Sequence, residues 1–202
     1  SRSVLMHIIN AIKTGDVNEA PRLEAMLSHT IQSNKEREMA YVRQATHDAL
    51  TGCKNRRAFD SDIAELLNAQ QPFAMALVDI DNFKSINDTL GHLTGDIVLR
   101  NVAREGIQIM QPHHVSVYRY GGEEFAVIFQ AEQMSSALSL LEAWRTAVEK
   151  RVWREENLRV TFSGGLGEWH FEPLEQFVGS VDNALYSAKQ QGKNRIVRTS
   201  IS

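Results

Sequence analysis

The chain of 202 residues has a single cysteine, no surplus of basic residues and no long apolar run. Its one cysteine, Cys53, excludes an internal disulfide and a metal cage built from several thiolates. The 22 Lys and Arg residues stand against 25 Asp and Glu residues, which gives a formal net charge of −3. This balance argues against duplex DNA or RNA as the main partner, because nucleic-acid binding needs a basic footprint.

The apolar stretches are too short to cross a membrane. The longest of them, such as residues 73–78, fall far below the ~20 residues that a spanning helix needs. The N-terminus also lacks the charged, apolar and small-residue regions of a secretory signal. With 43% hydrophobic and 23% charged residues, the chain should fold around a core. We therefore expect a cytoplasmic protein, and its start at Ser1 rather than methionine is what a fragment of a longer chain would show.

Residues 1–46 are predicted to form an N-terminal helical segment with a break at residues 15–16. Apolar residues recur at helical spacing before the break and again early in the second helix, which then becomes polar. Two interpretations stay open for this second helix. It is either a solvated connector, or a dimerisation helix that pairs with a copy of itself through Leu27, Ile31 and Tyr41.

Residues 47–198 are predicted to form one α+β domain, with a mixed central sheet flanked by helices and a tail at 199–202. Strands are expected at Phe73–Asp79, Val115–Tyr120, Phe125–Phe129, Leu158–Phe162 (running into Ser163-Gly164-Gly165) and Ile196-Val197. Helices are expected around residues 59–67, 83–90, 98–102, 137–148 and 174–188. No internal repeat or low-complexity tract interrupts this order.

A hairpin tip followed by two acids is predicted within the run Arg-Tyr-Gly-Gly-Glu-Glu-Phe. Gly121 and Gly122 allow a tight turn and a close approach of the backbone to a ligand. Glu123 and Glu124 follow at once, and adjacent strand residues point to opposite faces, so the two acids need not share a role. By itself this pattern also fits an ordinary turn with solubilising acids.

A second run places acids at the exit of the first apolar strand. Asp79 and Asp81 stand where a hard cation such as Mg²⁺ could be held together with phosphate oxygens and water. Lys84 and Asn87 lie three apart on the next helix, on a face distinct from that of Phe83, and the lysine could neutralise charge on a phosphate. The alternative is an acidic helix cap beside a surface lysine.

Together the two runs resemble the GGDEF family of diguanylate cyclases, with the signature written here as Gly-Gly-Glu-Glu-Phe. Further matching blocks are Asp48–Gly52, Asn55–Arg57, Gly91–Asp96 and Asp182–Arg195. The blocks span about residues 47–198, and four ordered blocks are far more specific than one short motif. The resemblance implies a palm-like fold, similar to that of nucleotidyl cyclases and polymerases. It also implies condensation of two GTP molecules into cyclic di-GMP and two pyrophosphates, as in bacterial second-messenger signalling and biofilm formation.

The resemblance implies a metal site made of Asp79, the main-chain carbonyl of Ile80, and Glu123, with Mg²⁺ or Mn²⁺ as the cofactor. Glu123 is also the family's suggested proton acceptor, although a metal-bound carboxylate is a poor base unless its environment tunes it. Glu124 would be a second metal-binding, catalytic or structural acid. Lys84 would stabilise the pentavalent phosphorus.

Guanine recognition is assigned by the same resemblance to Asn87 and Asp96. His92 would line the same pocket, or else be an ordinary histidine at a helix terminus. Because family members that make mixed cyclic dinucleotides tend to carry serine at the position of Asp96, we expect GTP-only chemistry. Lys189 and Lys193 would contact phosphates, the latter where arginine is common.

The sequence departs from the family at two places. The inhibitory Arg-x-x-Asp is absent, because Pro112–Val115 stand at its four positions, so we predict no product inhibition through that site. Within that stretch His113 and His114 are interpreted as a solvated loop rather than a metal site. Cys53 and Lys54 replace the usual Leu-Pro, and Cys53 is given no catalytic role.

The reaction implies a homodimer, because the 3′-hydroxyl of one GTP must attack the α-phosphorus of another held by a second domain. Residues 1–46 could then dimerise the chains and receive a regulatory protein or sensor domain. Two alternatives remain: a non-catalytic GGDEF module that binds GTP or cyclic di-GMP, and a helical interaction protein. The first is disfavoured because every signature acid, lysine and glycine named above is kept.

Overall fold

The computed structural model of the chain describes residues 2–15 and 17–200. They form two compact units, about residues 1–45 and 46–202. None of the described helices is long and apolar enough to cross a bilayer. Each unit is described by itself.

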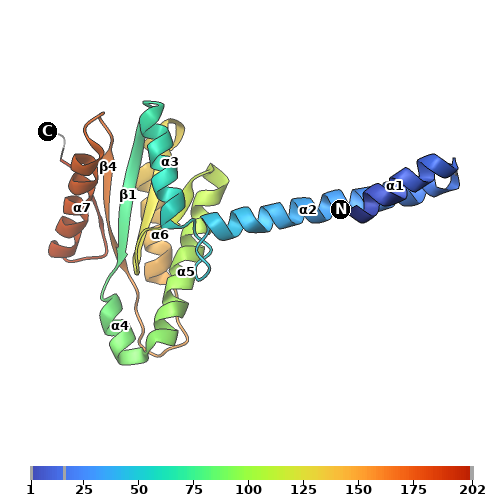
Figure 1. The fold of residues 1–202 in the computed structure, drawn as a ribbon. Helices are drawn as coiled ribbons and strands as arrows, with labels where there is room; N and C mark the ends of the chain where they lie inside the picture. The colour runs from blue at the N-terminus through green and yellow to red at the C-terminus, as the bar shows by residue number, and fades with distance from the viewer. Residues whose placement is uncertain (1, 16, 201–202) are drawn as a thin grey trace. The chain divides into compact units, whose positions relative to one another are not determined.

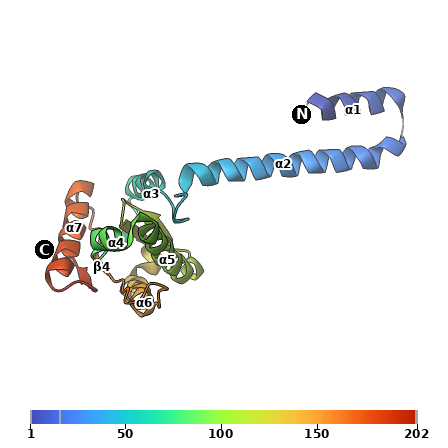
Figure 2. The same cartoon turned by 90° about the horizontal axis from the view of Figure 1, so that it is seen from below.

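The N-terminal unit consists of two helices, as predicted, with a 3-10 turn between them. Helix α1 (Arg2–Thr14) turns back along α2 (Ala20–Thr46), and η1 (Val17–Glu19) precedes α2 (Figure 2). Gly15 has a φ of +64°, which suits a chain reversal, while Asp16 of the predicted break lies outside the described residues.

This unit has almost no core of its own. Val4 is the one buried hydrophobic side chain among its described residues, and it lines a space of about 350 Å³ against α2. On α2, the side chains of Leu27, Ile31 and Tyr41 are 44%, 59% and 74% exposed. Two helices that bury so little apolar surface gain little stability from packing on each other.

The C-terminal unit is built on one five-stranded sheet in the order β2-β3-β1-β4-β5 (Figure 1). Its strands are β1 (Phe73–Ile80), β2 (Ser116–Arg119), β3 (Glu124–Gln130), β4 (Phe162–Glu168) and β5 (Ile196–Arg198). Strand β1 pairs antiparallel with β3 and β4, β2 pairs antiparallel with β3, and β5 runs parallel to β4. The predicted hairpin around the two glycines is therefore confirmed.

Helices cover both faces of this sheet. They are α3 (Arg56–Asn68), α4 (Phe83–Leu90), α5 (His92–Met110), α6 (Ala137–Lys150) and α7 (Leu174–Gln190), with 3-10 turns η2 (Gln111–His113) and η3 (Ala131–Ser136). Alternate β1 residues divide the core, as strand geometry requires. Ala76 and Val78 pack with α5 and α6, whereas Met75 and Leu77 pack with α3 and α7.

The fourth strand is displaced from its predicted position. We expected Leu158–Phe162, but β4 is Phe162–Glu168 and runs through Gly164, Gly165 and Gly167. A Cβ on Gly165 would lie 2.3 Å from the main-chain oxygen of Val181 in α7. The glycines, which indicate a turn when the sequence is considered locally, are needed because α7 lies directly on the strand.

We predict that Gly165→Ala destabilises the domain by about 2–3 kcal/mol, because the new methyl group meets helix backbone that cannot move alone. Gly179→Ala in α7 is the matched control, since nothing lies within 4 Å of its Cβ position. It should raise the free energy of unfolding by up to about 1 kcal/mol through helix propensity. Urea denaturation of both variants measures the difference, and equal stabilities would contradict the packing argument.

Candidate functional site

Four of the predicted site residues meet where β1 leaves the sheet. Asp79 is paired across the sheet with Glu124 on one side and Ser163 on the other. The main-chain N–H of Ile80 donates to the main-chain oxygen of Glu123 at 3.3 Å. The β1 exit and the hairpin tip therefore lie side by side, as the proposed metal site requires.

The buried carboxylate of Asp81 organises the same end of the sheet. It is 3% exposed and accepts hydrogen bonds from the hydroxyls of Thr161 and Ser163, both at 2.7 Å. It also accepts from the Lys189 ammonium at 2.8 Å and from the main-chain N–H of Asn194 at 3.0 Å. Sequence reasoning missed this role, and the only signal for it was the position of Asp81 directly after a buried strand.

The two lysines predicted to contact phosphates are held by side chains of the site. Nζ of Lys189 lies 2.7 Å from Oδ1 of Asp79, and the same ammonium bonds Asp81. Nζ of Lys193 donates to the side-chain oxygen of Asn82 at 2.7 Å. Lys193 is exposed enough to exchange this neutral partner for an anion, whereas Lys189 is committed to two carboxylates.

Helix α4 presents the other predicted lysine. Lys84 is exposed, while Phe83 and Ile86 are buried, in agreement with the distinct faces predicted for Lys84 and Phe83. Leu90, the last residue of the helix, is 40% exposed. Asn87 is half-buried against α5 and does not share the exposure of Lys84.

The carboxylate of Glu123 lies in an environment that disfavours its charge. Burial raises its pKa, the carboxylate of Asp79 raises it further, and Lys189 offsets part of this, so the pKa lies above its ordinary value of 4.5. Two carboxylates that raise each other's pKa, with Lys189 as only a partial counter-charge, are suited to share a cation.

Glu124 has a raised pKa for similar reasons, led by burial and followed by the carboxylates of Asp79 and Asp182. Arg56 partly offsets this shift. Its guanidinium stacks on the Tyr120 ring at 3.7 Å from the centroid and donates to the Tyr120 main-chain oxygen at 3.2 Å. Arg56 therefore stabilises the backbone at Tyr120, on the β2 side of the hairpin tip and near this second acid.

The donor set fits a divalent cation that takes most of its ligands from water and the substrate. Within the described ranges, no three His, Cys, Asp or Glu side chains are placed to hold a metal ion together. Mg²⁺, however, is usually bound by one or two carboxylates plus phosphates and water. Asp79 and Glu123 supply two such carboxylates, close enough for the charge of one to raise the pKa of the other.

A charged clamp fixes the backbone just before Glu123. The guanidinium of Arg119 donates to the main-chain oxygen of Gly122 at 2.9 and 3.2 Å and to the carboxylate of Asp48 at 3.1 Å. Asp48 also accepts from the main-chain N–H and the hydroxyl of Thr51. Burial raises the pKa of Asp48, but the Thr51 hydrogen bonds and Arg119 together lower it below its ordinary value. Sequence reasoning gave these residues no role.

The predicted guanine residues lie at the junction of α4 and α5. Asn87 of α4 packs on Gly95 of α5, which adjoins the half-buried Asp96. His92, the first residue of α5, is exposed. Asn87 thus lies against the residue that precedes Asp96 in α5.

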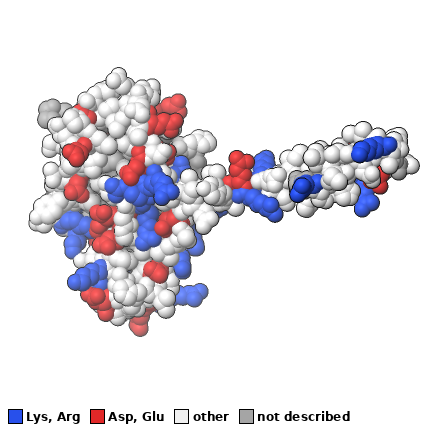
Figure 3. All heavy atoms as spheres, viewed as in Figure 1, with Lys and Arg blue, Asp and Glu red and all other residues white. Residues whose placement is uncertain are grey.

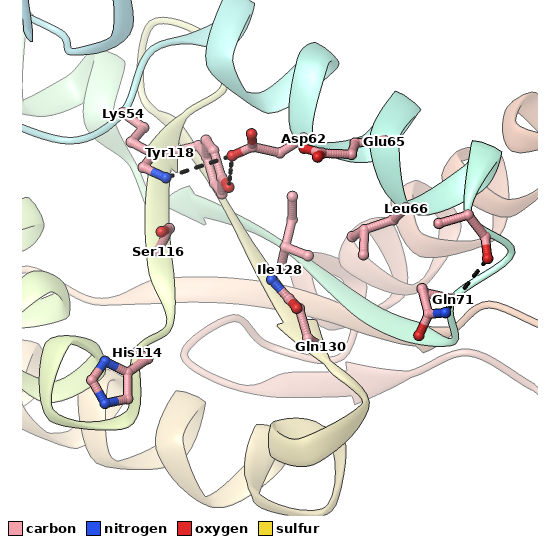
Figure 4. Close-up of a pocket in the computed structure, with 11 residues that line it drawn as sticks. Lys54, Asp62, Glu65, Leu66, Gln71, His114, Ser116, Tyr118, Ile128 and Gln130 are labelled. Carbon is pink, nitrogen blue, oxygen red and sulfur yellow. Dashed lines mark hydrogen bonds and ion pairs between the residues drawn. The ribbon is translucent and has the colours of Figure 1, made fainter. Parts of the chain in front are cut away.

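A cavity of about 400 Å³ lies elsewhere, between α3 and strands β2 and β3 (Figure 4). Its wall includes the carboxylate of Asp62, which accepts from the Tyr118 hydroxyl and lies 3.6 Å from Nζ of Lys54. None of the predicted site residues lines it. In Figure 3, basic side chains gather near the middle of the face shown of this unit, and acidic side chains lie around them.

Cys53, His113 and His114, to which the sequence assigned no chemistry, have surroundings that agree with this interpretation. Burial raises the pKa of the Cys53 thiol to about 12, so it is a poor nucleophile. His113 and His114 are both exposed, in agreement with a solvated turn.

The chain matches the family model described as "Diguanylate cyclase, GGDEF domain" over residues 45–195. The chain belongs to the GGDEF family. The chain is 37% identical over 169 residues to diguanylate cyclase VdcA of Vibrio cholerae, covering 81% of this chain and 50% of VdcA. It is 35% identical over 187 residues to diguanylate cyclase DgcM of Escherichia coli, covering 90% of this chain and 42% of DgcM. The chain thus spans half or less of these relatives' lengths.

Solved structures of the family match the GGDEF domain together with the helical segment before it. The coiled coil and GGDEF domain of DgcB from Caulobacter crescentus, in complex with c-di-GMP, matches with a TM-score of 0.74 and 32% identity, covering 90% of this chain and all of that one. Diguanylate cyclase SiaD from Pseudomonas aeruginosa, in complex with its activator SiaC, matches with a TM-score of 0.74 and 29% identity. The match covers 98% of this chain and 80% of the SiaD chain.

We predict that Asp81→Ala lowers the free energy of unfolding by about 3 kcal/mol, because it leaves buried donors without an acceptor. For a domain of this size the Tm should fall by roughly 6–12 °C. Asp88→Ala, which removes an exposed acid of α4, is the control and should change stability by less than about 0.5 kcal/mol.

The loss of stability caused by Asp81→Ala should depend on pH. Burial raises the pKa of Asp81, but hydrogen bonds from Lys189, Ser163 and Thr161 outweigh it and lower the pKa below its ordinary value of 3.8. The carboxylate therefore stabilises the fold above pH 3.8, and this contribution is lost as the pH falls through the lower, folded-state pKa. The stability gap between wild type and Asp81→Ala should narrow in that acidic window, and a gap independent of pH would contradict the prediction.

Proposed function

We propose that this chain is a diguanylate cyclase that condenses two GTP molecules into cyclic di-GMP with release of two pyrophosphates. The observation that carries the proposal is the meeting of Asp79, Glu123 and Lys189 at one end of the sheet. In this proposal these acids hold a cation, and Asn87 and Asp96 bind the base. Such a domain would work in the cytoplasm, where GTP is found.

Each part of the substrate has a matching group in this proposal. Asn87 and Asp96 would bind the guanine edge, with His92 at the rim. Lys193 can exchange its neutral partner for a phosphate, and the exposed Lys84 can neutralise charge on the phosphorus under attack. Lys189 would set the position of Asp79 more than it would bind phosphate, because two carboxylates already hold it.

The fit of the carboxylates to Mg²⁺, or to Mn²⁺ in its place, gives the acids their proposed role. Asp79, the Ile80 carbonyl and Glu123 would hold the ion, with Glu124 as a supporting acid. The bound ion would supply charge neutralisation at the phosphates. The clamp from Arg119 to the Gly122 carbonyl holds the Glu123 backbone in place without any ligand.

The reaction needs two domains, and the N-terminal unit is the proposed means of bringing them together. Its exposed Leu27 and Ile31 are available to a second copy of the chain. The match to SiaD, solved with its activator, extends over 98% of this chain and so includes this unit. We therefore propose residues 1–46 as the segment on which a regulatory partner acts.

Incubation of the purified chain with GTP and Mg²⁺ should yield cyclic di-GMP and pyrophosphate, measured by chromatography. Glu123→Gln keeps the shape and removes the charge, and should lower turnover at least about a hundredfold. Chelation of divalent cations should abolish turnover. GTP binding without turnover, even when two chains are fused into a dimer, would contradict the proposal and favour a non-catalytic binding module.

The role of the N-terminal unit has its own test. The double variant Leu27→Asp and Ile31→Asp should weaken dimerisation, because formation of the dimer would then bury two carboxylates per chain in an apolar contact. Turnover per chain should then fall at least about tenfold at low concentration and recover when the chain is fused to an unrelated dimer. Sedimentation and turnover are measured together. Unchanged dimerisation and unchanged turnover would overturn this role, and Gln32→Ala is the control for substitution on the same helix.

A further inference from the structure

The side-chain amide of Asn87, in the predicted guanine site, has a buried oxygen without a hydrogen bond, which the fold alone does not explain. Oδ1 of Asn87 is one of three buried side-chain polar atoms, among the described residues, that have no hydrogen-bond partner. A buried acceptor without a donor raises the free energy of the folded chain, so such an atom calls for a reason. The fold does not use Oδ1 to hold α4 to its neighbours.

The space that this amide occupies exists because residue 95 has no side chain. A Cβ on Gly95 would lie 1.8 Å from Oδ1 and 2.9 Å from Cγ of Asn87. Gly95 is buried within α5 and does not have a positive φ, so the backbone does not require glycine there. Alanine would favour the helix. Glycine at this position is therefore explained by the space that the Asn87 amide occupies and not by the needs of the helix backbone.

We propose that Gly95 is a positioning residue for purine recognition: its missing side chain leaves room for the Asn87 amide against α5, at the residue before Asp96, where this amide binds the base. The inference deepens the proposed function and rests on it, since it concerns how the same site selects guanosine nucleotides. It assigns the specificity of the site to the pair Asn87 and Gly95 rather than to Asn87 alone.

A methyl group at position 95 should displace the amide and leave the helix intact. The position of a Cβ is fixed by α5, whereas the Asn87 amide is the end of a short side chain that can rotate. The next nearest atom, Cζ of Phe83, lies at 3.3 Å, which a small shift of the ring accommodates. Gly95→Ala should therefore weaken nucleotide binding more than it weakens folding.

The test measures binding of α,β-methylene GTP, which cannot release pyrophosphate, to the full chain by calorimetry with Mg²⁺. Gly95→Ala should raise the Kd roughly tenfold, as expected for one lost hydrogen bond. Asn87→Ala should raise it by a similar factor. The double variant should bind no more weakly than Asn87→Ala alone, because the two changes remove the same contact. In turnover, the KM for GTP should rise with kcat little changed.

Two glycine variants separate positioning from general effects on structure. Gly179→Ala, on an exposed part of α7 with nothing within 4 Å, should leave the Kd unchanged. Gly106→Ala lies on α5 itself, where its Cβ would meet Cε2 of Trp144 at 2.6 Å, and should lower the Tm without changing the Kd.

The inference is overturned if Gly95→Ala binds the analogue as wild type does. It is equally overturned if Gly95→Ala weakens binding as strongly in the Asn87→Ala background as in wild type. Wild type that binds the analogue but makes no cyclic di-GMP would contradict the proposed function and leave the inference standing. Wild type that does not bind the analogue would contradict both.

Discussion

Asp81 accepts hydrogen bonds from the start of β4, the end of α7 and the loop that leads to β5, all converging on one buried carboxylate. Because Lys189 is one of these donors and also holds Asp79, the position of a proposed metal-binding acid depends on a group that is 3% exposed. The hydrogen bonds from Lys189 to Asp79 and Asp81 thus fix the position of this acid within the fold. Preorganisation of this kind is what positioning catalysis requires.

The proposed site collects its parts from separate segments of the domain. Its acids come from β1 and the hairpin tip, its lysines from α4 and from the C-terminal end of α7, and the groups proposed to bind the base from α4 and α5. Helix α7 can deliver Lys189 because it rests on the glycine strand β4. The hairpin tip is held independently, through Arg119 and Asp48.

Sequence patterns predicted the features that depend on local order. The apolar run at residues 73–79 and the Gly-Gly pair before Glu123 mark strand and turn by their own chemistry, and both were found. The glycines of β4 were misjudged because their cause is the distant α7 backbone. Asp79 and Asp81 look alike in sequence, yet one is paired across the sheet and the other is buried under four donors. Such differences arise only when remote segments pack together.

The small core of the N-terminal unit has a consequence for control. Val4 is its one buried hydrophobic side chain among the described residues, so in the proposed dimer the unit would gain most of its apolar burial from the second chain. Association between chains rises with their concentration, so product formation per chain should depend on how much protein the cell makes. Abundance would then act as an input to the signal, alongside any partner that binds the helices.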